Sequence, residues 1–144
     1  HVRTVISSGN VLFDADETDR AVLEHRIEAA LETHLGTHCS AIVRSRRQVA
    51  LLAGLDVFDD YDDTPARRCN VTFLQRAPST PLPEFEPEPG ATVVAVRSQA
   101  VFTVIDTTRA GTPRLMRDLE RSFGRAITMR TWRTVHRILD AFDT

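Results

Sequence analysis

The sequence predicts an α+β protein made of two β-α-β-β-α-type units in series with mainly antiparallel sheets, the first unit being short of one strand and one helix at its start. Short β-branched runs alternate with segments of helical periodicity, which indicates a mixed architecture. Turn residues join several neighbouring runs, which favours antiparallel pairing. With 144 residues, of which 42% are hydrophobic, the chain can bury a core without disulfides or metals.

The first predicted elements are two short strands, at residues 3–6 and 11–13. Between them lies Ser7-Ser8-Gly9-Asn10. Glycine and asparagine tolerate positive φ, so this segment suits a tight turn or a strand bulge.

A helix is predicted from Asp16 to Leu35, because apolar residues recur through this segment at helical spacing. We expect Asp16 or Thr18 to cap its start, with Asp19 favourable in the first turn. Gly36 follows the last apolar residue and is expected to end the helix.

Residues 39–44 have the pattern of another short strand, and a capping box at Ser45 opens a brief helix. A loop rich in aspartate follows. We therefore predict a first α+β half at residues 1–54, an acidic connecting loop at 55–68 and a second α+β half with a C-terminal helix at 69–144.

The second half combines strands, a proline-rich connection and two helices. The connection contains five prolines between residues 78 and 89, which break any long element there. The other predicted elements are a strand at Cys69–Leu74, an antiparallel hairpin at Ala91–Val96 and Ala100–Ile105, a helix begun by Thr112 and Pro113 and ended before Gly124, and a final helix at about Thr131–Phe142.

The composition excludes several mechanisms. All 18 residues of the Lys+Arg count are arginines, so this chain has no P-loop lysine, no Schiff-base lysine and no kinase-type strand lysine. Cys39 and Cys69 form no Cys-x-x-Cys pair and are expected to be two buried free thiols of a cytoplasmic protein. No stretch approaches the roughly 20 apolar residues that cross a bilayer, so we expect no membrane partner.

Two segments resemble motifs of one family. The opening V-R-T-V-I-S-S-G-N-V-L-F is similar to "V-x-T-Y-I-Q-S-G-N-V", and the later T-M-R-T-W-R-T-V, which ends at Val135, resembles "T-T-R-N-W-x-T-V". Both patterns are hallmarks of the bacterial domain of unknown function 1697 family. The resemblance implies a cytoplasmic bacterial protein with two serial ferredoxin-like halves, and it implies no established activity.

Members of that family begin with a strand similar to "L-L-R-G-I-N-V-G-G" and a helix, for which this chain has no counterpart. The chain starts at His1, directly before a predicted strand, so we expect it to be a piece of a longer protein. The resemblance therefore implies a first half truncated at its N-terminus. Such a piece is expected to expose apolar surface and an open strand edge, and to aggregate or pair with itself.

The final third of the chain is basic. From Arg109 to Arg137 there are eight arginines against two acids, Asp118 and Glu120. Arginine makes planar, bidentate contacts to phosphate or carboxylate, which makes Arg130, Arg133 and Arg137, with Thr134 among them, candidate ligand-binding residues. The alternative interpretation is a solvated helix face whose charges pair with nearby acids.

Two further features suggest a ligand. The turn Ser8-Gly9-Asn10 could present backbone N–H groups and polar side chains to an anion, or serve turn geometry alone. Trp132 is flanked by Arg130 and Arg133, an arrangement that can stack a base. At helical spacing with Val135 and Leu139, however, Trp132 is more typical of a core residue.

No metal site and no cofactor are predicted. His34, His38 and Cys39 lack a second pair of ligands at zinc-site spacing. The acidic run at residues 59–63 lacks the alternating ligands and terminal glutamate of a calcium loop. No catalytic residue can be assigned.

Three functions remain open. The first is a binding module for a small phosphate-bearing or other anionic ligand. The second is a small enzyme, independent of lysine and metal, with its site between the two halves. The third is a protein-interaction or oligomerisation domain. We do not expect general nucleic-acid binding, because the net charge is −2 and residues 14–32 hold seven acids against two arginines.

Overall fold

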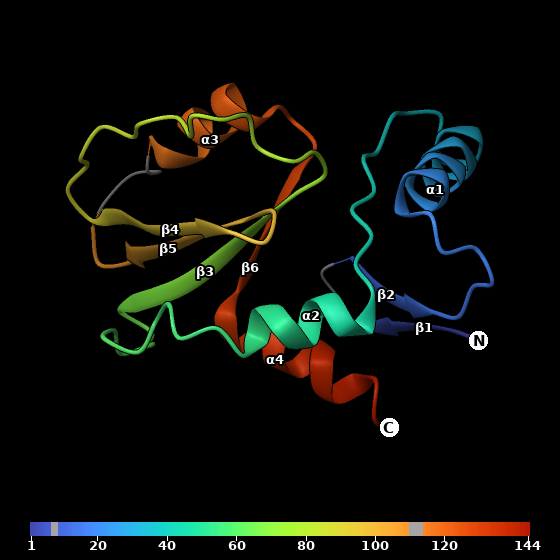
Figure 1. Cartoon of the computed structure of the whole chain (residues 1–144), viewed down its shortest axis with the longest axis horizontal. Coiled ribbons are helices and arrows are strands. Elements are labelled where there is room, and N and C mark those ends of the chain that lie inside the picture. The colour runs from blue at the N-terminus through green and yellow to red at the C-terminus, as the bar shows by residue number, and fades with distance from the viewer. Residues whose placement is uncertain (7–8, 110–113) are drawn as a thin grey trace. The chain divides into compact units, whose positions relative to one another are not determined.

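Residues 1–6, 9–109 and 114–144 are described by a computed structural model, which has four helices and two antiparallel sheets in these ranges (Figure 1). The predicted α+β class is therefore confirmed. The strands are β1 (Val2–Val5), β2 (Asn10–Phe13), β3 (Arg67–Leu74), β4 (Ala91–Arg97), β5 (Ala100–Asp106) and β6 (Ile127–Thr131). The helices are α1 (Arg20–Leu35), α2 (Arg46–Ala53), α3 (Leu115–Phe123) and α4 (Trp132–Ala141).

The chain forms two compact units. Unit 1 comprises His1–Ala53 together with Arg133–Thr144, and unit 2 comprises Gly54–Trp132. This division differs from the predicted one in two places. The acidic segment at 55–68 is part of unit 2 rather than a separate connection, and the final helix, apart from Trp132, belongs with the first part of the chain.

The centre of unit 2 is a four-stranded sheet in the order β4-β5-β3-β6. β3 pairs antiparallel with β5, where Val71 lies opposite Phe102, and with β6, where Thr72 lies opposite Met129. Because both edges of β3 are occupied, its residues from Cys69 to Leu74 are all buried. The predicted strands are confirmed as β3, β4 and β5, whereas β6 was missed by the sequence prediction.

The connection between β3 and β4 is described throughout and contains no helix. The connection is the proline-rich segment, as the sequence predicts. Ferredoxin-like halves in series stay a prediction.

Helix α3 covers one face of this sheet. Its Leu115 and Leu119 pack with Leu74 and Val101 in a buried cluster, which Phe85 of the proline-rich segment borders. Side chains two residues apart on a strand share a face. The same face therefore carries three buried polar side chains, Asn70, Thr72 and Thr103.

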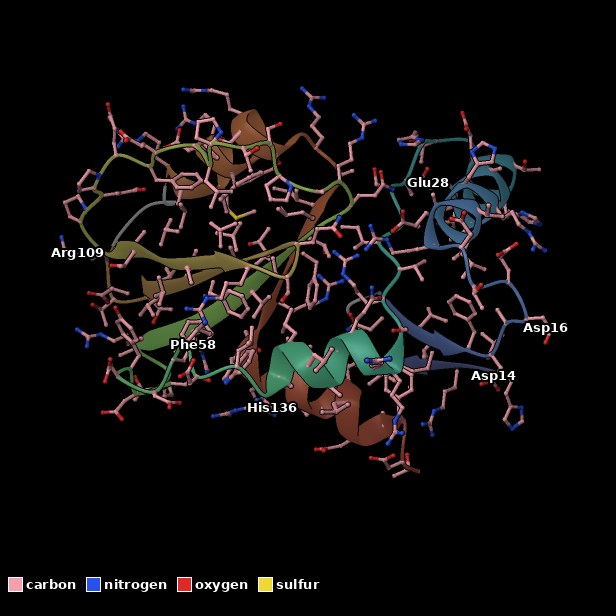
Figure 2. All side chains as sticks on the ribbon, viewed as in Figure 1. Asp14, Asp16, Glu28, Phe58, Arg109 and His136 are labelled. Atoms are coloured by element: carbon pink, nitrogen blue, oxygen red, sulfur yellow. The ribbon has the colours of Figure 1, made fainter. Side chains whose placement is uncertain are left out.

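The opposite face of the sheet is covered by aromatic rings. The ring centroids of Phe58 and Phe102 lie 5.7 Å apart, and that of Trp132 lies 5.2 Å from Phe58 and 6.1 Å from Phe102. All three pairs meet edge to face, the arrangement that the aromatic quadrupole favours. Phe58, labelled in Figure 2, comes from the segment before β3, so this segment completes the core of unit 2.

The start of α3 is capped from a distance. The carboxylate oxygens of Glu88 accept hydrogen bonds from the backbone N–H groups of Arg114, at 2.7 Å, and Leu115, at 3.0 Å. These are two of the N–H groups that a helix start leaves without an intrahelical partner. Thr112 and Pro113, the predicted start of this helix, lie outside the described residues.

Unit 1 begins with the predicted hairpin, in which β1 pairs antiparallel with β2 and Arg3 lies opposite Leu12. Helix α1 follows. Its N-cap is Asp19, whose side chain accepts hydrogen bonds from the N–H groups of Ala21 and Val22, so the predicted caps Asp16 and Thr18 are wrong. The predicted end is confirmed, because Gly36 has the left-handed φ of +70°.

Helix α1 holds the following segment by carboxylates. Glu24 accepts a hydrogen bond from the N–H of Val43, and Glu28, labelled in Figure 2, accepts one from the N–H of Ala41, both at 2.9 Å. Residues 39–44 consequently use side chains as partners and form no strand, so the strand predicted there is wrong. Glu24 is the buried residue of α1.

Apolar side chains are exposed mainly in unit 1. Among the described residues, four of the sixteen buried apolar residues belong to it, namely Leu12, Val49, Leu52 and Val135. Five of the six exposed large apolar side chains also belong to it: Val2, Val11, Val22, Leu35 and Leu51. Among the described residues, unit 1 thus carries most of the exposed large apolar side chains, while an open strand edge and aggregation stay predictions.

We predict that Thr72→Val and Thr103→Val each stabilise unit 2. Within the described residues neither hydroxyl oxygen has a hydrogen-bond partner. An unsatisfied buried hydroxyl costs about 1–3 kcal/mol, and valine has nearly the same shape. Chemical denaturation followed by the fluorescence of the single Trp132 measures the change. Thr92→Val, at an exposed position of β4, controls for strand propensity. A loss of stability at Thr72 and Thr103 would show that these hydroxyls do bind a partner.

We also predict that Glu88→Ala lowers the free energy of unfolding by about 1 kcal/mol, the usual cost of losing a helix cap. The matched control is Glu86→Ala. Glu86 lies two residues away, is 85% exposed, and makes a 3.6 Å ion pair with Arg114. Exposed ion pairs contribute little, so this variant should unfold at nearly the wild-type denaturant concentration. Equal losses in the two variants would contradict a capping role for Glu88.

Candidate functional site

A pocket of about 420 Å³ lies within unit 1, between β1 and the last turns of α4. Its volume falls in the range of small-molecule sites, roughly 300–1,000 Å³. The lining residues are Arg3, Thr4, Val5, Ile6, Arg137, Asp140, Ala141 and Thr144. This is the candidate functional site of the chain.

The hairpin register brings Arg3 to the site. Arg3 shares a face with Leu12, which is 8% exposed and belongs to the core. The guanidinium of Arg3 then extends to Thr144 and donates to its hydroxyl oxygen at 3.1 Å and its backbone oxygen at 3.4 Å. These contacts link β1 to the residues that follow α4.

Helix α4 brings two opposite charges to the site. Arg137 and Asp140 are three residues apart and therefore share a helix face. Val135 of this helix is buried, and Asp143, which follows the helix, makes an exposed ion pair with Arg46 of α2. In the part of the chain that the structure describes, neither Arg137 nor Asp140 makes an ion pair within 4.0 Å.

The pocket therefore contains two guanidinium groups and one acidic side chain, with hydroxyl groups and a small apolar surface. Each guanidinium offers several N–H donors in a planar arrangement. Cysteine, histidine and serine are missing from the described lining, so it offers no conventional nucleophile paired with a base. The arrangement is suited to binding.

Two residues of the predicted turn, Gly9 and Asn10, are described by the structure and do not line this pocket. Gly9 has a φ of +76°, in the left-handed region that glycine adopts freely, and Asn10 donates a hydrogen bond from its side-chain amide to the backbone oxygen of Val5 at 3.2 Å. Both residues thus serve the hairpin. Ser8, the third predicted residue of the turn, lies outside the described residues.

Two predicted ligand-binding residues belong to unit 2. Arg130 lies on β6 and donates to the hydroxyl of Thr128 at 2.6 Å and to the backbone oxygen of Met129 at 2.8 Å. Burial lowers the pKa of its guanidinium. Trp132 lies in the aromatic cluster that covers the sheet. Both side chains have structural contacts, and contact of either with a ligand stays a prediction.

The other predicted residues lie on α4. Arg133 is exposed and Thr134 is half-buried, and neither residue lines the pocket. His136, labelled in Figure 2, is exposed and does not line the pocket either. Of the predicted residues that the structure describes, Arg137 alone lines it. The sequence prediction missed Arg3 and Asp140. The register of β1 against β2 places Arg3 on the face of Leu12, and the sequence alone does not indicate that Arg3 meets residues near the end of the chain.

A second charged cluster in unit 1 is structural. Burial, followed by the positive charge of Arg20, lowers the pKa of Arg44 to about 10, while Glu24 acts in the opposite direction. Glu24 lies 3.7 Å from Arg20 and already accepts the N–H of Val43. The groups of this cluster thus engage one another and hold the segment after α1.

The chemical inventory contains few other candidates. No group of three or more potential metal ligands occurs in residues 1–6, 9–109 and 114–144. Both cysteines are free thiols, with Cys69 buried and Cys39 half-buried. Searching the same residues identifies no helix with the length and apolarity that crossing a membrane requires.

Comparison with known proteins identifies the family. The family model described as "Protein of unknown function (DUF1697)" matches residues 1–102. The chain belongs to this family. The DUF1697 match includes β1, from which Arg3 comes, and ends within β5, so α4 and the second of the two motifs lie beyond it. No curated protein and no solved structure matches the chain.

We predict that Cys39 reacts with a chromogenic disulfide reagent in the native protein and that Cys69 does not. Burial, followed by the negative charges of Asp63 and Asp62, raises the pKa of the Cys69 thiol and so suppresses its thiolate. Thiol titration at pH 8 should release about one equivalent of chromophore, and about two after unfolding. Cys39→Ala should abolish the native reaction. Rapid release of two equivalents from the folded chain would overturn this prediction.

Proposed function

We propose that this DUF1697 protein is a binding module for a small anionic ligand, phosphate-bearing ligands included, and that the ligand occupies the pocket of unit 1. One observation carries this proposal. Arg3 and Arg137, from β1 and α4, line a single pocket, and Arg137 makes no ion pair with the described residues. An anion in the pocket is a partner that both guanidiniums can share.

Physical chemistry favours an anion at this place. Each guanidinium presents a planar array of donors that matches the oxygens of a phosphate or carboxylate, and such charge-assisted hydrogen bonds are stronger than neutral ones. The hydroxyls of Thr4 and Thr144 supply further polar groups. The contact of Arg3 with Thr144 already restricts its side chain, which reduces the entropy lost on binding.

The proposal changes the set of predicted ligand-binding residues. It retains Arg137 and adds Arg3. Gly9 and Asn10 do not line the pocket and serve the hairpin instead. Arg130, Trp132, Arg133 and Thr134 are not required for it.

The two other predicted functions receive less support. The described lining provides binding groups without an evident nucleophile, which favours a binding module over an enzyme acting through this pocket. The exposed apolar side chains of unit 1 are compatible with an interaction domain, but they do not account for two arginines at one pocket.

We predict that Arg137→Ala and Arg3→Ala each weaken binding of inorganic phosphate or pyrophosphate by about tenfold, the effect of losing one charge-assisted contact. Isothermal titration calorimetry at low and moderate salt measures this affinity. Because the site is open to solvent, binding should also weaken as salt rises.

The matched control is Arg133→Ala. Arg133 lies on the same helix one turn before Arg137, is also exposed, and does not line the pocket. The Arg133→Ala variant loses one positive charge, as the two test variants do, but the pocket lining is unchanged. This variant should therefore bind phosphate with nearly the affinity of the wild type. An equal loss in all three variants would indicate general attraction by net charge, and the absence of any phosphate binding by the wild type would end the proposal.

A further inference from the structure

Asp140 is the one acidic side chain in the described lining of the pocket. It lies one turn after Arg137 on α4 and is exposed. In the described part of the chain its carboxylate makes neither a hydrogen bond nor an ion pair. A pocket that simply attracted anions would be better without this negative charge.

We infer that the ligand is a small phosphate monoester that also carries a protonated amine. Its phosphate binds Arg3 and Arg137, and its ammonium group binds Asp140. This inference rests on the proposed function, because it assigns the second group of the same ligand.

Charge balance favours this class of ligand. A phosphate monoester carries about −1.5 to −2 charges at pH 7, which balances the two guanidiniums. An ammonium group then balances Asp140, and it changes the repulsion between that carboxylate and the phosphate into an attraction. A ligand whose only charged group is a phosphate leaves the Asp140 carboxylate unpaired near a second negative charge. The repulsion between these two charges is strongest where water is partly excluded.

Arg137 and Asp140 share one face of α4, yet the structure shows no ion pair between them within 4.0 Å in the described residues. The carboxylate of Asp140 is therefore available to a ligand. Val5, Ile6 and Ala141 add apolar surface that a short carbon chain between the two ligand groups can contact.

The test uses two ligands that differ only in the amine, ethyl phosphate and O-phosphoethanolamine. Calorimetry on the full chain should show O-phosphoethanolamine binding about fivefold more tightly, the effect of one exposed ion pair. Asp140→Asn should remove this preference while leaving or slightly improving the binding of ethyl phosphate. Asp140→Glu keeps the charge and should keep the preference.

Asp143→Asn is the matched control, since Asp143 is exposed, lies three residues after Asp140 and does not line the pocket. It should leave the ratio of the two affinities unchanged. Thermal melting of each variant establishes that it is folded. Glycerophosphoethanolamine, a diester like a lipid headgroup, should bind more weakly because it carries one negative charge, and equal binding would overturn the monoester assignment.

The remaining outcomes separate the two proposals. Equal binding of both esters to the wild type and to Asp140→Asn would overturn the inference and leave the anion site standing. Binding of neither ester to the wild type would overturn the anion site itself.

Discussion

The double pairing of β3 is the constraint on which unit 2 depends. Because β5 and β6 occupy both of its edges, every residue from Cys69 to Leu74 is buried, and both faces of the sheet need a cover. Helix α3 covers one face with Leu115 and Leu119, and the rings of Phe58 and Trp132 cover the other. The long segments before and after β3 are therefore parts of one core, although they contain little regular structure.

Unit 1 is organised by polar contacts to a greater degree. Helix α1 buries Glu24 and hydrogen-bonds the following segment through two carboxylates, while several of its apolar side chains remain exposed. A buried carboxylate is acceptable only when its oxygens are engaged, and a backbone N–H supplies that partner here. Val22 and Leu35 of this helix are left at the surface, so they bury less apolar area than core residues do.

Local signals explain what the sequence could predict. Helix α1 and the β4–β5 hairpin follow from periodicity and turn residues that are close in sequence, and both are found. The failures involve partners distant in sequence. Residues 39–44 have strand-forming side chains, but the N–H groups of Ala41 and Val43 donate to Glu28 and Glu24. The cap of α3 is Glu88, which is 26 residues away from Arg114 in the sequence. Of the site, Arg137 could be predicted from the basic tail, whereas Arg3 enters it through tertiary packing.

A comparison of Arg133 with Arg137 shows why composition alone could not find the site. The chain uses arginine for every residue of its Lys+Arg count, so the presence of arginine on α4 carries little information. Both residues are exposed on the same helix, and neither makes an ion pair with the described residues. What distinguishes Arg137 is the pocket that it shares with Arg3 and Asp140. Charged side chains can select a ligand where the fold brings several of them around one pocket. This pocket is lined by both positive and negative side chains. The proposed selectivity for a ligand with two charged groups rests on this arrangement, because a partner that satisfies only one sign leaves the other unpaired.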